Sequence, residues 1–197
     1  DDLRRFVAEN AITAALIDGL GDTPTVPAAA AALGVDVQAL TAGCDTVTFC
    51  LSKGLGAPVG SVVCGEKNFI GEARRARKVL GGGMRQAGVL AAAGLVALDR
   101  MDGRLAEDHA NARSLAEGLS TLPGLRIDLE RVRTNLVFID VVDPDRTAPQ
   151  LVEQLASGGV KVLAAAGRRI RAVTHNDVSA EDIERAIHVF QAASASG

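Results

Sequence analysis

The stretch DTVTFCLSKGLGAPVGSVVC, residues 45–64, decides how the rest of the chain is interpreted. Val47, Phe49 and Leu51 alternate with small or polar residues, a period of two that predicts a strand ending before Ser52 and Lys53. Three of the seven residues that follow Lys53 are glycine, which tolerates unusual backbone angles and lets a ligand approach closely. Residues 59–64 predict a second short strand. Lys53 therefore stands at the mouth of a strand–loop–strand turn, where it could capture the carbonyl group of a cofactor.

Two interpretations of Lys53 follow from these residues alone. One is an ordinary surface lysine in a turn rich in glycine and proline. The other is a lysine that condenses with a carbonyl compound, which requires loss of its proton, and partial desolvation near other cations favours that loss. Short motifs often occur by chance, so spacing does not decide between the two.

Two longer motifs favour the second interpretation. SKGLGAPVGS (52–61) and GGGMRQ (81–86) resemble the low-specificity L-threonine aldolases of the threonine aldolase and beta-eliminating lyase family. The resemblance runs from about residue 31 to about residue 186. It implies an α/β chain of the aspartate-aminotransferase fold (fold type I), which binds pyridoxal 5'-phosphate (PLP). Residues 1–98 would be the lysine-bearing end of the PLP-binding large domain, and residues 99–197 a small C-terminal α/β domain.

The resemblance also implies roles for individual residues. Lys53, beside Ser52, would form the covalent link to PLP, and Arg85 would help to hold the cofactor or the substrate carboxylate. Arg171, in the segment IRAVTH, would grip the carboxylate of the amino acid with its planar guanidinium. PLP would act as the electron sink while a β-hydroxy amino acid such as L-threonine or L-allo-threonine breaks into glycine and an aldehyde. Asn135 could either support this site or be plain turn chemistry.

The sequence departs from the family in its N-terminal part. The family's His-x-Asp-Gly-Ala-Arg segment, whose Asp pairs with the pyridine nitrogen of PLP, aligns without a gap on Asp22, and Asp18 is the alternative if an insertion is allowed. Neither alignment supplies the histidine or the arginine. The family's N-terminal half is missing, so we expect a partner chain to complete the sheet, a rearranged chain, or an incomplete sequence.

Composition excludes several classes of protein. Apolar residues make up 48% of the chain and charged residues 23%, which is ordinary for a globular protein. Trp and Tyr are absent, which predicts an aliphatic, alanine-rich core. A net charge of −3 gives no general attraction to nucleic acid, no apolar run is long enough for a membrane span, and the start DDLRR does not resemble a signal peptide. Cys44, Cys50 and Cys64 lack the spacing of a disulfide framework or a zinc site, so we expect a cytoplasmic protein without metal.

Hydrophobic periodicity and turn residues predict the remaining elements. Residues 86–101 are apolar nearly all round and predict a buried helix. Ser179 and Asp182 predict a capping box at the last helix. The other expected helices cover residues 3–20, 28–33, 37–41, 66–79, 104–122, 148–156 and 180–193, and the other expected strands cover residues 125–129, 136–141, 161–164 and 170–174.

Three functions remain open at this point. The first is a threonine aldolase-type lyase in glycine and amino-acid metabolism, assembled as a homo-oligomer like its family and active only with the missing half or a complementary subunit. The second is a non-catalytic scaffold that retains the fold but lacks a complete cofactor site. The third is a different PLP reaction, such as β-elimination. Joint retention of the lysine loop, the GGGMRQ motif and the Arg171 segment favours the first.

Overall fold

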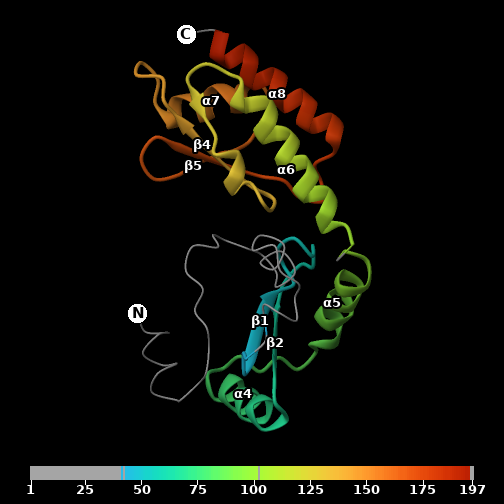
Figure 1. The fold of residues 1–197 in the computed structure, drawn as a ribbon. Coiled ribbons are helices and arrows are strands. Elements are labelled where there is room, and N and C mark those ends of the chain that lie inside the picture. The colour runs from blue at the N-terminus through green and yellow to red at the C-terminus, as the bar shows by residue number, and fades with distance from the viewer. Residues whose placement is uncertain (1–40, 42, 102, 196–197) are drawn as a thin grey trace. The chain divides into compact units, whose positions relative to one another are not determined.

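The structure is a computed structural model that describes residues 41, 43–101 and 103–195. The chain divides between Gly103 and Arg104 into two compact units, shown in Figure 1. The predicted helices at 3–20, 28–33 and 37–41 fall on residues outside this description, apart from Thr41. We describe each unit by itself.

The N-terminal unit contains the predicted strand–loop–strand turn. Strands β1 (Thr46–Cys50) and β2 (Ser61–Gly65) pair antiparallel, with Thr46 opposite Gly65 and Cys50 opposite Ser61. Helix α4 (Lys67–Val79) follows directly, and Phe69 on its first turn packs close to Gly65. Helix α5 (Gly88–Arg100) completes the described part of this unit. These four elements confirm the strands and helices predicted for this segment, with small shifts at their ends.

The C-terminal unit is a four-stranded antiparallel sheet covered by helices on one face (Figure 1). The strand order is β3-β4-β6-β5, and all three pairings are antiparallel. The elements along the chain are α6 (Leu105–Ser120), β3 (Leu125–Arg126), the 3-10 helix η1 (Leu129–Arg131), β4 (Leu136–Val141), α7 (Ala148–Ser157), β5 (Leu163–Ala164), β6 (Arg169–Val173) and α8 (Ala180–Ala195).

Alternation along the two central strands builds the core of this unit. Val137, Ile139 and Val141 of β4 face the helices and are at most 2% exposed, and Ile170 and Ala172 of β6 lie on the same side. Aliphatic side chains from α6, α7 and α8 meet them, so the core is aliphatic and rich in alanine as predicted. The other face of the same strands carries Phe138 and Arg169, which are exposed.

Local capping explains where two helices begin. The Asp182 carboxylate accepts hydrogen bonds from the backbone nitrogen (3.0 Å) and hydroxyl (2.9 Å) of Ser179, and the Asp182 backbone nitrogen donates to the Ser179 hydroxyl (3.2 Å). This confirms the predicted capping box at α8. A second box, Thr147 with Gln150, begins α7, with proline in its first turn.

Several expectations are corrected. Helix α5 was predicted to be buried, but only Gly94 and Ala97 are, whereas Val89 is 76% and Leu95 is 67% exposed. The sequence of α5 is apolar on all sides, which suits a helix that other elements cover on two faces. The described residues cover only one of these faces. Cys64 is also exposed, because the outer side of the two-stranded hairpin lacks a covering layer among the described residues. The strands expected at 125–129 and 161–164 are shortened to two residues each.

Candidate functional site

The loop that carries Lys53 is closed by backbone hydrogen bonds. The Leu51 nitrogen donates to the Gly60 carbonyl (2.9 Å), and the Ala57 nitrogen donates to the Leu51 carbonyl (3.0 Å). Within it, the Gly56 nitrogen donates to the Lys53 carbonyl at 2.8 Å, which makes a tight turn at the lysine itself. Gly60 has φ 119°, a left-handed conformation that favours glycine. The glycines in this motif therefore allow the backbone conformation of the turn that carries Lys53.

Apolar side chains hold this loop down while Lys53 points outward. Leu51, Leu55 and Ala57 are at most 9% exposed. Helix α5 approaches Leu51 so closely that a Cβ atom on Gly94 would lie 3.0 Å from the Leu51 Cδ1 atom. Ser52 and Lys53, in contrast, are exposed. Lys53 is thus held on a fixed turn with its side chain exposed to solvent, so the described residues do not provide the partial desolvation that would favour loss of its proton.

The GGGMRQ motif forms a turn packed on the end of α4. The Leu80 nitrogen donates to the Ala76 carbonyl (2.9 Å) and the Gly82 nitrogen to the Arg77 carbonyl (2.8 Å). A Cβ atom on Gly82 would lie 3.0 Å from Arg77 Cγ, and one on Gly83 would lie 2.8 Å from Lys78 Cδ. The glycines leave room for these two cationic side chains. Arg85 follows as an exposed third cation, so the turn has the charge to attract an anion.

Arg171 lies in β6 of the C-terminal unit. It pairs with Phe138 of β4 on one side and with Leu163 of β5 on the other, and it is half-buried. Because Ile170 and Ala172 face the helices, Arg171 belongs to the opposite, helix-free face of the sheet. Lys53 and Arg85 lie in the N-terminal unit, whereas the candidate cofactor residues Asp22 and Asp18 lie outside the described residues.

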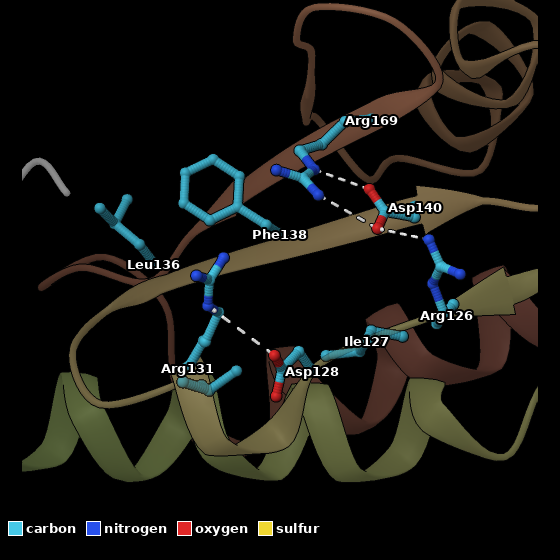
Figure 2. Close-up of a pocket in the computed structure, with 9 residues that line it drawn as sticks. Arg126, Ile127, Asp128, Arg131, Leu136, Phe138, Asp140 and Arg169 are labelled. Atoms are coloured by element: carbon cyan, nitrogen blue, oxygen red, sulfur yellow. Dashed lines mark hydrogen bonds and ion pairs between the residues drawn. The ribbon is translucent and has the colours of Figure 1, made fainter. Parts of the chain in front are cut away.

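A groove of about 420 Å³ lies between the segment of β3 and η1 and the outward side chains of β4 and β6, as Figure 2 shows, and Arg171 is not among the residues that line it. Arg169 binds Asp140 through two hydrogen bonds (2.6 and 3.1 Å) and lies 5.8 Å from the centre of the Phe138 ring. The hydrogen bond from Arg169 lowers the pKa of the Asp140 carboxyl, and Asp140 in turn raises the pKa of Arg169. Arg126 also pairs with Asp140 (3.4 Å), and Arg131 with Asp128 (3.8 Å). Each arginine of this groove therefore has a carboxylate partner, but three arginines share two carboxylates, which leaves one formal positive charge.

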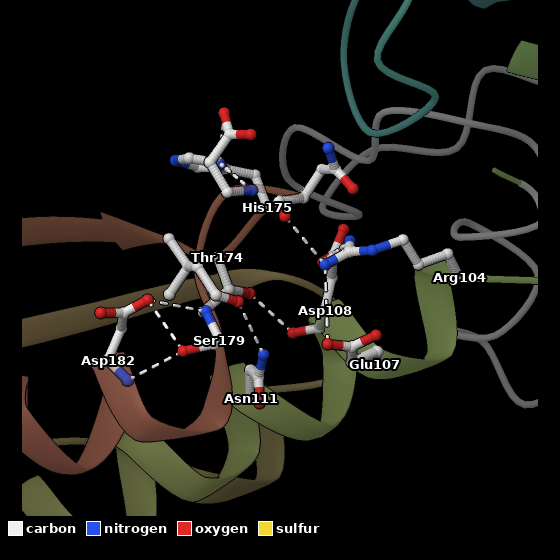
Figure 3. Close-up of polar contacts among 11 residues, drawn as sticks. Arg104, Glu107, Asp108, Asn111, Thr174, His175, Ser179 and Asp182 are labelled. Atoms are coloured by element: carbon white, nitrogen blue, oxygen red, sulfur yellow. Dashed lines mark hydrogen bonds and ion pairs between the residues drawn. The ribbon is translucent and has the colours of Figure 1, made fainter.

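A buried polar cluster connects α6 with the residues after β6 (Figure 3). Arg104 binds the buried Asp108 carboxylate at 2.7 Å, and the Thr174 hydroxyl donates to the Asp108 backbone carbonyl at 2.6 Å. Asn135 is also buried and donates to the Thr174 carbonyl at 2.9 Å. Asn135 was left open between support and turn chemistry, and its burial and hydrogen bond give it a supporting role.

Asp108 and Thr174 were not predicted from sequence to belong to this cluster. A signal was present, because Asp108 falls on the same side of α6 as Leu105, Ala112 and Leu115, where a polar residue requires a partner. His109, next to it, is half-buried. Burial lowers the pKa of His109, and the neighbouring Asp108 charge opposes this shift. Among the described residues, no group of His, Cys, Asp and Glu side chains could hold a metal ion.

A comparison with known families matches residues 7–144 to the model described as beta-eliminating lyase. The chain belongs to this family. The match includes Lys53 and Arg85 and ends before Arg171. Low-specificity L-threonine aldolase 1 of Arabidopsis thaliana is 46% identical over 166 residues, which are 84% of this chain and 46% of the relative. These findings confirm the resemblance inferred from the two motifs.

Solved structures confirm the fold class of this beta-eliminating lyase family member. A crystal structure from Exiguobacterium sp. 255-15, described as aromatic amino acid beta-eliminating lyase/threonine aldolase, superposes with a TM-score of 0.67 at 19% identity. It is matched over 98% of this chain and 55% of its own length. A structure of SPT with PLP internal aldimine gives a TM-score of 0.65 at 24% identity, covering 81% of this chain and 42% of the other. The chain thus spans about half the length of the proteins it matches.

None of the helices in the described residues combines the length and the apolar character that crossing a membrane requires.

Proposed function

We propose that this chain is part of a PLP-dependent lyase that cleaves L-threonine and L-allo-threonine into glycine and an aldehyde. The observation that carries the proposal is the placement of Lys53 on a glycine turn anchored by buried Leu51, Leu55 and Ala57. It occurs in a chain that is 46% identical to an L-threonine aldolase over 84% of its length.

The residues present fit PLP in two respects. Lys53 offers an amine to the aldehyde of the cofactor, and Ser52 lies beside it in the same loop. Arg77 and Lys78 pack against Gly82 and Gly83, and Arg85 follows in the same turn, so three cationic residues are available to an anionic group such as a phosphate or a carboxylate. Asp22 is proposed as the partner of the pyridine nitrogen, with Asp18 as the alternative.

When bound, PLP supplies the electron sink that stabilises the negative charge left on Cα as the Cα–Cβ bond breaks. The chain's own residues supply binding and orientation. Arg171 binds the substrate carboxylate, because a guanidinium can donate two parallel hydrogen bonds to a carboxylate. Arg85 is proposed to assist with the carboxylate or the cofactor. Lys53 in its neutral form has a free electron pair on Nζ and can also accept and return a proton near the reacting carbon.

The setting of the reaction follows as part of the proposal. Residues 1–98 would form the cofactor-binding portion and residues 99–197 the smaller portion with Arg171. The exposed apolar residues of α5, including Val89 and Leu95, support assembly into a homo-oligomer. The three unpaired cysteines support a reducing, cytoplasmic location, and the product glycine suggests a role in its biosynthesis.

Aldehyde release tests this function. The purified chain, incubated with PLP and L-threonine, should release acetaldehyde, and Lys53→Ala should abolish the release. Lys67→Ala, which removes another exposed lysine of the same unit, is the matched control and should retain it. PLP-dependent turnover that survives Lys53→Ala would remove Lys53 from the reaction. Absence of turnover in the unmodified chain, even when the N-terminal half of a family member is added, would favour the non-catalytic scaffold.

A second candidate is β-elimination, because the matching family model carries that description. A β-eliminating enzyme would convert L-serine into pyruvate and ammonia, without releasing an aldehyde from L-threonine. Measuring pyruvate and aldehyde on the same preparation therefore separates the two reactions.

A further inference from the structure

Thr174, the first residue after β6, has all of its polar groups bound. It is 1% exposed. Its hydroxyl donates to the Asp108 carbonyl at 2.6 Å, its backbone nitrogen donates to the Asn135 carbonyl at 3.0 Å, and its carbonyl accepts from Asn135 Nδ2 at 2.9 Å. The end of β6 is thus tied to α6 through the hydroxyl and to the start of β4 through the backbone (Figure 3).

The same cluster fixes the residues that follow. Arg104 donates to the Asn176 carbonyl at 3.1 Å while it binds Asp108, and Asn111 donates to the Val178 carbonyl at 3.1 Å. The start of α6 therefore holds the segment after β6 through two side chains, Arg104 and Asn111, that lie about two helical turns apart. This gives the end of the strand a single position along the helix.

Stability alone is a poor explanation for this arrangement. Asp108 Oδ2 and Asn135 Oδ1 are buried and have no hydrogen-bond partner among the described residues. Each such atom destabilises the folded state because its hydrogen bonds to water are lost and not replaced, and well-packed apolar residues often replace a buried ion pair without loss of stability. A buried network that retains unpaired polar atoms is better explained by a role in fixing the position of β6.

The position that it fixes includes that of Arg171. Side chains alternate along β6, so Ile170, Ala172 and Thr174 face the helices while Arg171 and Val173 face the other way. A shift of one residue would turn Arg171 toward the core. We infer that Thr174, held by Asp108 and Asn135, is a positioning residue for Arg171, and this inference rests on the proposed role of Arg171 in binding the substrate carboxylate.

Thr174→Val tests the inference, because valine has the shape of threonine without the hydroxyl. Hydrogen exchange of the β6 amides, residues 169–173, should become roughly tenfold faster in Thr174→Val, the loss expected for one buried hydrogen bond. Thr174→Ser, which keeps the hydroxyl, should restore slow exchange. Leu155→Val in α7 is the control for general destabilisation. Unchanged exchange in Thr174→Val, or an equal effect of Leu155→Val, would overturn the positioning of β6.

Steady-state kinetics of the PLP-loaded chain with L-threonine test whether Thr174 acts through Arg171. Thr174→Val should raise KM about tenfold with kcat within about twofold of the starting value, and it should add nothing in an Arg171→Ala background. Equal effects in both backgrounds would contradict the inference. A chain without threonine cleavage would refute the proposed function, while the exchange comparison would still decide whether Thr174 fixes the strand of Arg171.

Discussion

The contact between α6 and α8 allows a double-mutant test. The effect of Gly118→Ala on the free energy of unfolding should change sign when Ile187 is replaced by alanine. Gly118 lies in the last turn of α6, and a Cβ atom there would lie 2.5 Å from Cδ1, 3.0 Å from Cγ1 and 3.3 Å from Cγ2 of Ile187 on α8. Alanine in a helix interior is favoured over glycine by about 1 kcal/mol. Overpacking a close contact costs about 1–3 kcal/mol. Because three atoms of Ile187 crowd the position, we expect Gly118→Ala to lower the free energy of unfolding by about 1 kcal/mol.

Ile187→Ala removes the crowding atoms. In the Ile187→Ala background only the helix preference of alanine over glycine remains, so Gly118→Ala should raise the free energy of unfolding by about 1 kcal/mol. The coupling between the two sites would then be about 2 kcal/mol. Gly71 in α4 is the control, since a Cβ atom there would meet nothing within 4 Å, and Gly71→Ala should stabilise the chain.

Urea unfolding followed by helical circular dichroism measures these differences. If Gly118→Ala stabilised the unmodified chain as Gly71→Ala does, the close packing of α6 against α8 would be refuted. That packing supports the sheet that carries Arg171, so the result bears on the candidate site as well.

Three further predictions concern pH and capping. Asp140→Asn should cost up to about 1 kcal/mol at pH 7, because the pair with Arg169 is partly exposed. The lowered pKa of Asp140 means that this contribution is present above the ordinary aspartate value of about 3.9 and is lost as the pH falls below it. In urea unfolding, the difference in free energy between the unmodified chain and Asp140→Asn should therefore be present at pH 7 and disappear at low pH. The lowered pKa of His109 means that the chain is most stable above about pH 6.5 and loses stability as the pH falls from there, a slope that should be reduced in His109→Gln. Thr147→Ala should lower the free energy of unfolding by about 1 kcal/mol by removing the cap of α7, whereas Ser157→Ala at the other end of that helix should have little effect.

Much of the C-terminal unit could be predicted from sequence, because its signals are local. Strand β4 was predicted with its observed bounds, since Val137, Ile139 and Val141 alternate with outward residues. The box at Ser179 and Asp182 marked the start of α8. The lengths of β3 and β5 could not be predicted, because each depends on pairing with a distant strand. The exposure of α5 could not be predicted either, since an apolar sequence shows that a helix suits burial but not what covers it.

Of the candidate site, likewise, only the features set by neighbouring residues could be predicted from sequence. The loop of Lys53 was predicted because its glycines and its flanking strands are adjacent in sequence. The hydrogen bond between Thr174 and Asp108 joins residues 66 positions apart, and no pattern near either residue indicates the other. Arg171 could be assigned to the outward side of a strand, but its place beside Phe138 and Leu163 follows only from the sheet register.

The most direct test of the account is to locate the bond between PLP and the chain. The chain has four lysines, Lys53, Lys67, Lys78 and Lys161, so peptide mapping after borohydride reduction can distinguish them. The account predicts that one equivalent of PLP is fixed on Lys53 and that Lys53→Ala removes both the adduct and its visible absorbance. An adduct spread over the four lysines, or located on one of the other three, would contradict it.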